Sequence, residues 1–152
     1  MELMNINDLC FWTGVIVAIL CGAIIGYERQ LKDKPVGART SILICLGTQI
    51  FVNIGTSFTG PGIDPTRVIG QVVTGIGFIG GGVILARRGV VVGVTTAAVI
   101  WVLAAIGVVI GVQRYTTAII LSIITVAVLV GLDLLEEKIF SKIEGRHSKK
   151  DD

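Results

Sequence analysis

Long apolar segments separated by short polar ones dominate the hydrophobic pattern of this chain. Between Thr40 and Leu132 the charged residues are few: Asp64, Arg67, the Arg87–Arg88 pair and Arg114. A helix needs about 20 mostly apolar residues to cross the ~30 Å hydrocarbon core of a bilayer. The segments that reach or approach that length are residues 9–26, 40–58, 65–86, 95–112 and 116–132. The pattern therefore predicts five membrane spans, preceded by residues 1–8 and followed by residues 133–152.

These segments have the character of helices rather than strands. Many of their residues are Val and Ile, which favour strands in water. The runs are long, however, and they lack the period-two alternation of a half-buried strand. Backbone groups in the bilayer core must also find partners within their own segment, which favours helices over an open sheet. We therefore expect an all-α, polytopic membrane protein built as a bundle of five transmembrane helices over residues 9–132.

The composition agrees with that of a membrane protein and excludes several other classes of protein. Hydrophobic residues make up 53% of the chain, to which 20 glycines are added, and charged residues make up 16%. A soluble domain has about 25% charged residues. The mean hydropathy is +0.85. These values exclude a disordered chain, a disulfide scaffold and a nucleic-acid-binding module.

The distribution of Lys and Arg predicts the orientation. Of the 13 Lys and Arg residues, all but Arg67 and Arg114 fall on one side of the predicted membrane. Cytoplasmic loops carry the excess of such residues. We therefore expect an extracytoplasmic N-terminus at residues 1–8 and a cytoplasmic tail at residues 133–152. The helical spacing of apolar residues at 134, 135, 139 and 143 predicts that this charged tail begins as an amphipathic helix.

Small residues follow helical spacing in the first and third spans. Such residues let helix backbones approach closely in a bilayer, so they predict a tight bundle or a dimer seam. The third span contains five glycines within residues 75–82. This segment is either locally unwound, exposing backbone groups to a ligand, or a continuous helix packed tightly between neighbours. The predicted packing positions are Gly14, Ala18, Gly22, Gly26, Gly75, Gly77, Gly80 and Gly81.

The residues that carry most catalytic and metal chemistry are scarce. His147 is the sole histidine, and Cys10, Cys21 and Cys45 form no C-x-x-C pair. No pairing of a nucleophile with a base is visible. We therefore predict no catalytic residues, no metal site and no cofactor, and we do not expect an enzyme.

Polar residues at the ends of the spans are the candidates for function. Charges at membrane depth are costly, so they tend to be partnered or functional; the alternative is ordinary anchoring at the interface. Asp64 lies three residues before Arg67 and is positioned to pair with it. Arg67 leads into the glycine-rich third span, whereas the side chain of Lys32 can reach water. We therefore expect Arg67→Ala to impair function more than Lys32→Ala. The candidate network comprises Glu28, Arg29, Arg39, Thr40, Asp64, Arg67 and Gln71.

The same region offers helix-capping residues. Asp64 followed by proline fits the start of the third helix, and Thr95 or Thr96 fits the start of the fourth.

Five groups of residues, taken in order along the chain, match the pattern of a known protein family. They are Gly26-Tyr-Glu28-Arg29-Gln30, Gly37-Ala-Arg39-Thr40, Asp64-Pro-Thr-Arg67, the glycine-rich run from Gln71 to Gly80, and the stretch from Thr95 through Trp101 to Gly107. Their order and spacing resemble those of the MgtC/SapB family of bacterial inner-membrane proteins, over about residues 10–135. The resemblance implies a five-helix domain in the bacterial cytoplasmic membrane. Magnesium-linked virulence members carry a further soluble domain after the fifth helix. In the sequence given, only residues 133–152 follow the fifth span, so we expect this chain to resemble the short members of the family.

The family resemblance also implies a role. The family is tied to adaptation to low magnesium and, in pathogens, to survival inside macrophages, with inhibition of the F-type ATP synthase as the proposed mechanism. We therefore expect a non-enzymatic regulator of magnesium homeostasis that acts through contacts with another membrane protein, the ATP synthase being the candidate partner. The alternative is a small ion transporter or channel with a polar path near Asp64, Arg67 and Gln71. Besides the lipid bilayer, the chain is expected to contact a second copy of itself, a dimer being favoured; no nucleic acid is expected.

Overall fold

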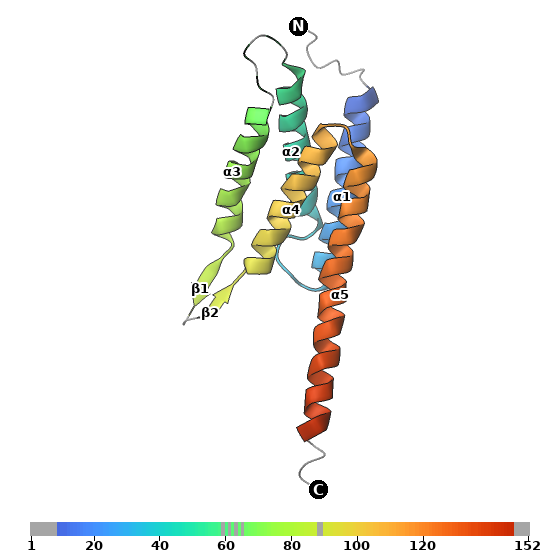
Figure 1. Ribbon diagram of the computed structural model, residues 1–152, viewed down its shortest axis with the longest axis vertical. Coiled ribbons are helices and arrows are strands. Elements are labelled where there is room, and N and C mark those ends of the chain that lie inside the picture. Colours follow the sequence, from blue (N-terminus) through green and yellow to red (C-terminus); the bar gives the residue numbers. More distant parts are fainter. Residues whose placement is uncertain are drawn as a thin grey trace.

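The computed structural model describes residues 9–58, 60, 62, 64, 66–87 and 90–147 (Figure 1). This part of the chain is predominantly helical, which confirms the expected all-α class. Residues 1–8, including the predicted extracytoplasmic N-terminus, and residues 148–152 of the predicted tail lie outside the described residues. The elements, in order, are α1 (Leu9–Leu31), α2 (Ala38–Ser57), α3 (Thr66–Gly82), β1 (Leu85–Arg87), β2 (Val90–Val92), α4 (Val94–Gly111) and α5 (Tyr115–His147).

The centre of the bundle is formed by α1, α2 and α4. Its buried apolar cluster includes Cys21 and Ile25 of α1, Cys45 of α2, and Leu103 and Ile106 of α4. The fifth helix, α5, packs against α1 and α4, while α3 packs mainly against α4. Most residues of α3 and of α5 up to Leu135 are therefore left exposed at the periphery, as the surface of a bundle in lipid would be.

Four of the described helices are long and apolar enough to cross a membrane: Leu9–Leu31, Ala38–Ser57, Val94–Gly111 and the first part of α5, Tyr115–Leu135. The exception is α3, which has 17 residues. At 1.5 Å per residue this helix is about 25 Å long, short of the ~30 Å hydrocarbon core. The predicted third span, 65–86, thus holds a helix only to Gly82.

A small β-hairpin stands where the sequence analysis predicted the end of the third span. Its strands β1 and β2 pair antiparallel, with Leu85 opposite Val92 and Ala86 opposite Val91. The three consecutive glycines that end α3 are poor helix formers, and the Val residues of β2 favour an extended backbone. Glycine propensity and β-branched residues therefore account for the change from helix to hairpin.

The start of α4 differs from the prediction of a threonine cap. Gly93 is the N-cap residue, with φ of 91°, and no side chain of the described residues caps this helix. A Cβ at position 93 would collide with the carbonyl oxygen of Val83. Glycine is therefore required here both by its backbone conformation and by the close approach of the hairpin. The predicted cap Thr96 has another partner, described below.

The last helix is the longest. It has 33 residues, and its C-terminal part extends well beyond the other helices (Figure 1). The fifth apolar segment therefore continues as helix into the predicted tail without a break. In Figure 1 the α1–α2 connection and the β-hairpin lie toward the end of the bundle from which α5 projects, and the start of α3 lies at the opposite end.

Candidate functional site

The predicted polar residues do not form one network. Glu28 and Arg29 are in the last turns of α1, and Arg39 and Thr40 are in the first turn of α2. Asp64 and the residues that follow it stand at the start of α3, at the opposite end of the bundle (Figure 1). The structure therefore places the first four candidates at the α1–α2 end and Asp64 and Arg67 at the α3 N-terminus. Thr40 and Gln71 both line a groove between α2 and α3.

Buried charge distinguishes the first group. Arg29 is 4% exposed and Glu28 is 7% exposed. The Nη2 atom of Arg29 donates a hydrogen bond of 3.1 Å to Oγ1 of Thr96, which is itself buried in the first turn of α4. Arg29 thereby ties α1 to α4, while Arg39 and Thr40 are exposed. The hydroxyl predicted to cap α4 serves as the acceptor for this buried guanidinium.

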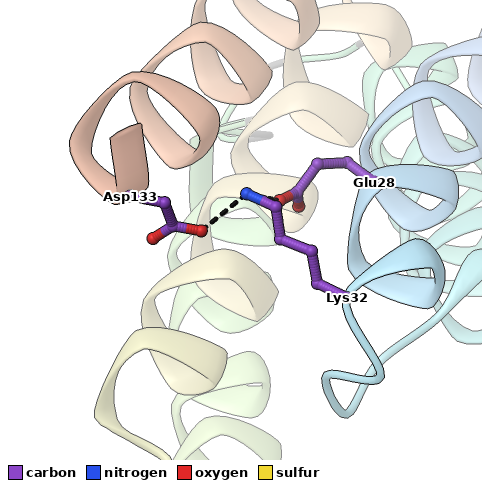
Figure 2. Close-up of polar contacts among 3 residues, drawn as sticks. All are labelled: Glu28, Lys32 and Asp133. Atoms are coloured by element: carbon purple, nitrogen blue, oxygen red, sulfur yellow. Dashed lines mark hydrogen bonds and ion pairs between the residues drawn. The ribbon is translucent and has the colours of Figure 1, made fainter. Parts of the chain in front are cut away.

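Figure 2 shows a three-residue charge cluster that includes Glu28, the neighbour of Arg29 in sequence. The Nζ atom of Lys32 lies 3.0 Å from Oε1 of Glu28 and 2.6 Å from Oδ2 of Asp133. The first carboxylate belongs to α1 and the second to α5, so one ammonium group links two helices. Hydrogen bonds to Asp133 and Glu28 hold the pKa of Lys32 above its ordinary value. We call Glu28, Lys32 and Asp133 the charge cluster.

Lys32 and Asp133 were not among the residues predicted from sequence. The depth argument assigned Lys32 to ordinary anchoring at the interface, because its side chain can reach water. A usable signal was present, however. Asp133 is the first acidic residue after the fifth apolar segment and falls on the same predicted side as Lys32, so an ion pair between these two positions was open to prediction.

At the other end of the bundle, Asp64 caps α3. Its Oδ1 atom accepts a hydrogen bond of 2.9 Å from the backbone N–H of Thr66 and one of 2.7 Å from the Thr66 hydroxyl. This geometry confirms the predicted cap. The same hydrogen bonds lower the pKa of Asp64, with a smaller contribution from the charge of Arg67. The carboxylate thus pairs with Thr66 in place of the ion pair expected with Arg67.

Arg67 and Gln71 are exposed on α3. Gln71 does face a defined feature, an apolar groove between α2 and α3 with a volume of about 630 Å³. We call this feature the α2–α3 groove. Its walls include Leu43, Gly47 and Phe51 from α2 and Gln71, Gly75 and Ile79 from α3.

The predicted packing residues of α1 lie in a close seam with α2. Gly14, Ala18, Gly22 and Gly26 are all buried. A Cβ on Gly22 would stand 2.6 Å from Cα of Ile42, and a Cβ on Gly26 would stand 2.5 Å from Cα of Ala38. Both distances are shorter than real contacts, so only glycine permits this approach of the two backbones. We call this contact the α1–α2 seam.

The glycines of α3 are placed differently. A Cβ on Gly75, Gly77 or Gly81 would meet no atom within 4 Å among the described residues, and one on Gly80 would meet only Ala97 of α4, at 3.6 Å or more. The predicted packing positions of α3, other than Gly80, therefore have no packing partner within the described chain. The helix is also continuous through Gly82, so the described segment is not locally unwound.

The site offers limited means of holding a metal. Among the described residues, no three His, Cys, Asp or Glu side chains gather into a metal-binding group. The two carboxylates that do converge are Glu28 and Asp133, on the ammonium of Lys32 (Figure 2). The described residues thus offer a charge cluster at the α1–α2 end of the bundle and an apolar groove between α2 and α3 with a glycine on each wall.

Comparison with known proteins gives a consistent result. The MgtC family model matches residues 15–138. The putative magnesium transporter YhiD of Escherichia coli is 44% identical over 135 residues, which are 84% of this chain and 62% of that protein. Protein MgtC of Brucella abortus is 39% identical over 111 residues, covering 73% of this chain and 46% of that protein. No solved structure matches this chain significantly. The chain thus spans less than two thirds of the length of these relatives.

Proposed function

This chain belongs to the MgtC family, and we propose that it is a non-enzymatic regulator in the bacterial cytoplasmic membrane that serves adaptation to low magnesium by binding another membrane protein. The names of its relatives support the link to magnesium: one is named a putative magnesium transporter and another protein MgtC. The candidate partner implied by the family resemblance is the F-type ATP synthase. We propose that the partner contributes a transmembrane helix that lies in the α2–α3 groove.

The observation that carries this proposal is the open space beside two glycines of the groove, Gly47 and Gly75. Between helices in lipid there is no hydrophobic driving force, so association depends on close van der Waals packing at small residues. Gly47 and Gly75 stand on opposite walls of the groove, and a Cβ on either would meet nothing within 4 Å in the described chain. A partner helix would therefore find room for a close backbone approach.

The rim of the groove supports the same proposal. Leu43, Phe51 and Ile79 line it and are 66%, 64% and 50% exposed, respectively. Large apolar side chains beside small ones form the ridges and hollows that helices use to pack. A helix lying in the groove would cover these side chains while filling the space above the glycines.

Filling the groove with side chains of this chain tests the proposal. Gly47→Leu and Gly75→Leu each place a Cβ where no described atom lies within 4 Å, so the fold is expected to persist. Gly131→Leu is the matched control, because Gly131 of α5 also has open space at its Cβ. We expect the groove variants to fail, and the control to succeed, in restoring growth at limiting magnesium to a strain that lacks the protein. Equal growth with all variants, at matched expression, would contradict a role for the groove.

Crosslinking identifies what lies in the groove. A photoreactive residue at Leu43 or Ile79, introduced into cells grown at limiting magnesium, should give a product with a different membrane protein. The control position is Ile123, which is 56% exposed on α5. A product with twice the mass of this chain would instead show that the groove belongs to a dimer interface and would overturn the proposal of a separate partner.

Transport is a second candidate function. The E. coli relative bears the name of a putative magnesium transporter, and the polar side chain of Gln71 lines the α2–α3 groove. Transport predicts magnesium flux in liposomes containing the purified chain, reduced by Gln71→Leu. Flux no greater than that of empty liposomes would remove this candidate.

The proposed orientation follows the distribution of basic residues. Lys and Arg are concentrated in cytoplasmic loops, and Lys32 and Arg39 stand at the α1–α2 end of the bundle. We propose that this end faces the cytoplasm and that the N-terminus faces outward. Membrane-impermeant labelling of single cysteines in place of Lys34 and Arg114 should reach opposite sides. Labelling of both from one side would contradict the proposed topology.

A further inference from the structure

We propose that Glu28 and Asp133 form a binding site for a divalent cation, in which the ammonium group of Lys32 acts as a tethered competitor. The charge cluster shares no residue with the α2–α3 groove, and this inference does not depend on the partner proposed above. It concerns what the chain itself senses at the end of the bundle where basic residues are concentrated.

The geometry of the cluster brings two carboxylates to one point. Oε1 of Glu28 is 3.0 Å and Oδ2 of Asp133 is 2.6 Å from the same Lys32 nitrogen. These residues come from α1 and α5, which are distant in sequence, and Figure 2 shows both side chains directed at the ammonium group. Mg²⁺ is commonly held by one or two carboxylates while it keeps several of its waters. Two convergent carboxylates therefore match the number that a protein commonly supplies to Mg²⁺.

The second oxygen of Glu28 provides independent support. Glu28 is 7% exposed, and its Oε2 atom is buried without a hydrogen-bond partner among the described residues. A buried carboxylate oxygen that lacks a donor is unfavourable. Lys32 satisfies only the other oxygen of this carboxylate. A hydrated cation would supply water molecules or a direct bond to Oε2, so this oxygen would gain the partner that the ammonium group does not provide.

The charge cluster is exposed at Lys32 and Asp133, whereas Glu28 is buried. The side chain of Lys32 is 31% exposed and that of Asp133 is 52% exposed. A lysine ammonium is a compact point charge on a flexible stem, so Lys32 can swing outward as a cation enters. Exchange of one cation for another keeps the two carboxylates compensated throughout.

Nearby positive charge sets the strength of the proposed site. Arg29 and Lys34 both act electrostatically on Asp133, and Lys32 competes directly. Each of these charges weakens cation binding. We therefore expect binding at millimolar rather than micromolar concentrations, where a change in the magnesium supply would change the occupancy.

The exchange has a structural consequence. With Lys32 in place, one side chain links α1 to α5 through its two ion pairs. With a divalent cation in place, the two carboxylates are linked through the metal and Lys32 is released to solvent. The link between α1 and α5 therefore persists, while the charge displayed at this end of the bundle changes.

Cation binding by the purified full chain in lipid nanodiscs tests the proposal. The probe is Mn²⁺, which reports binding by its electron paramagnetic resonance signal, with MgCl2 as the competitor. Asp133→Asn removes an exposed carboxylate and should abolish specific binding. Lys32→Gln removes the competitor and both of its ion pairs, and it should tighten binding by about fivefold, which corresponds to the upper value of ~1 kcal/mol for an exposed ion pair.

The matched control is Lys34→Gln, which removes the same charge from the same loop without removing a contact to either carboxylate. Its affinity should rise less than that of Lys32→Gln. Equal affinities for these two variants would overturn competition by Lys32. Unchanged binding by Asp133→Asn would overturn the site itself and leave the cluster a structural ion pair only.

A stability measurement separates this inference from the proposed partner. In Lys32→Gln the two carboxylates lose their shared counter-charge, so MgCl2 should raise the unfolding temperature of this variant more than that of the wild type. NaCl at equal ionic strength should not reproduce the difference. A variant that responds equally to both salts contradicts the proposal. The groove variants Gly47→Leu and Gly75→Leu should keep wild-type Mn²⁺ binding whether or not a partner binds the groove.

Discussion

In α1 the glycines and the buried charges contact neighbouring helices, whereas comparable residues of α3 are exposed. Gly22 of α1 lies against the backbone of α2, and Arg29 donates a hydrogen bond to Thr96 of α4. In α3, Gly75 faces no described atom within 4 Å, and Arg67 is exposed. Residues of the same kinds therefore stabilise the fold in one helix and provide a free surface in the other.

The position of each helix in the bundle explains the difference. Neighbours surround α1 on several sides, because α2, α4 and α5 all contact it. The contacts of α3 are chiefly with α4, and its approach to α2 is close where a Cβ on Gly55 would touch Val68. Beyond that point the two helices diverge around the α2–α3 groove. The difference between α1 and α3 is therefore one of neighbours rather than of composition.

The largest expected effect comes from the same substitution in the two helices. Gly22→Ala places a Cβ 2.6 Å from Cα of Ile42, and a backbone cannot move aside cheaply. We expect it to lower the free energy of unfolding by about 2–3 kcal/mol, the upper part of the range for overpacked sites. Gly75→Ala should leave stability unchanged or raise it by up to about 1 kcal/mol, because alanine is the better helix former. Unfolding in mixed micelles measures both.

A similar loss of stability in the two variants would show that α3 is packed as tightly as α1. The contrast between seam and groove would then fail.

The next effect concerns the buried charge of α1. Thr96→Val removes the acceptor of Arg29 and leaves a buried guanidinium group without it. We expect a loss of about 1–2 kcal/mol, since an unsatisfied buried polar group costs about that amount. Gln71→Leu on α3 removes an exposed polar group and should change stability little. Thr95→Val is the control, because Thr95 is exposed beside Thr96; equal losses for Thr95→Val and Thr96→Val would refute the role of the hydrogen bond.

Local sequence signals predicted much of the fold. Apolar segment length identified the helices, and the cap at Asp64 followed from residue type and position. The four-residue spacing of Gly14 to Gly26 placed these residues on one face, which the structure packs against α2. These features depend on a residue and its near neighbours, so a sequence contains the information directly.

The candidate site was less predictable because it depends on which helices meet. The sequence cannot distinguish Gly75, which faces a groove, from Gly22, which faces a backbone, since both occur in small-residue patterns. The charge cluster joins Glu28 to Asp133 across distant parts of the chain. The hairpin after Gly82 was also missed, because a run of Val and Ile fits a membrane helix as well as a strand.

The third prediction is the opposite of the sequence-based expectation that Arg67→Ala would impair function more than Lys32→Ala. Lys32 holds two carboxylates, while Arg67 is exposed and forms no ion pair with the described residues. We therefore expect Lys32→Ala to reduce the restoration of growth at limiting magnesium more than Arg67→Ala does, at matched expression. Lys34→Ala is the control for loss of charge from the same loop. A larger defect in Arg67→Ala would restore the importance of the α3 N-terminus and weaken the contrast with α1.

The smallest effect should appear at the start of α3 and should depend on pH. The bonds from Thr66 lower the pKa of Asp64, so the folded state favours the ionised carboxylate. The stabilisation is present at neutral pH and is lost as the pH falls through this lowered pKa. Because α3 is peripheral, we expect the change in amide exchange at the first turn of α3 rather than in global unfolding, measured between about pH 6 and about pH 2 after correction for intrinsic exchange.

Two variants separate the cap from other effects of acid. Asp64→Asn keeps an oxygen acceptor at every pH, and asparagine is as good an N-cap as aspartate, so protection of this turn should stay constant. Asp64→Ala should lose protection even at neutral pH and show no further loss in acid. If protection in the wild type falls at the α1 C-terminus as much as at the α3 N-terminus, the acid effect is global, and Asp64 does not act as a local cap on a helix that the bundle leaves largely free.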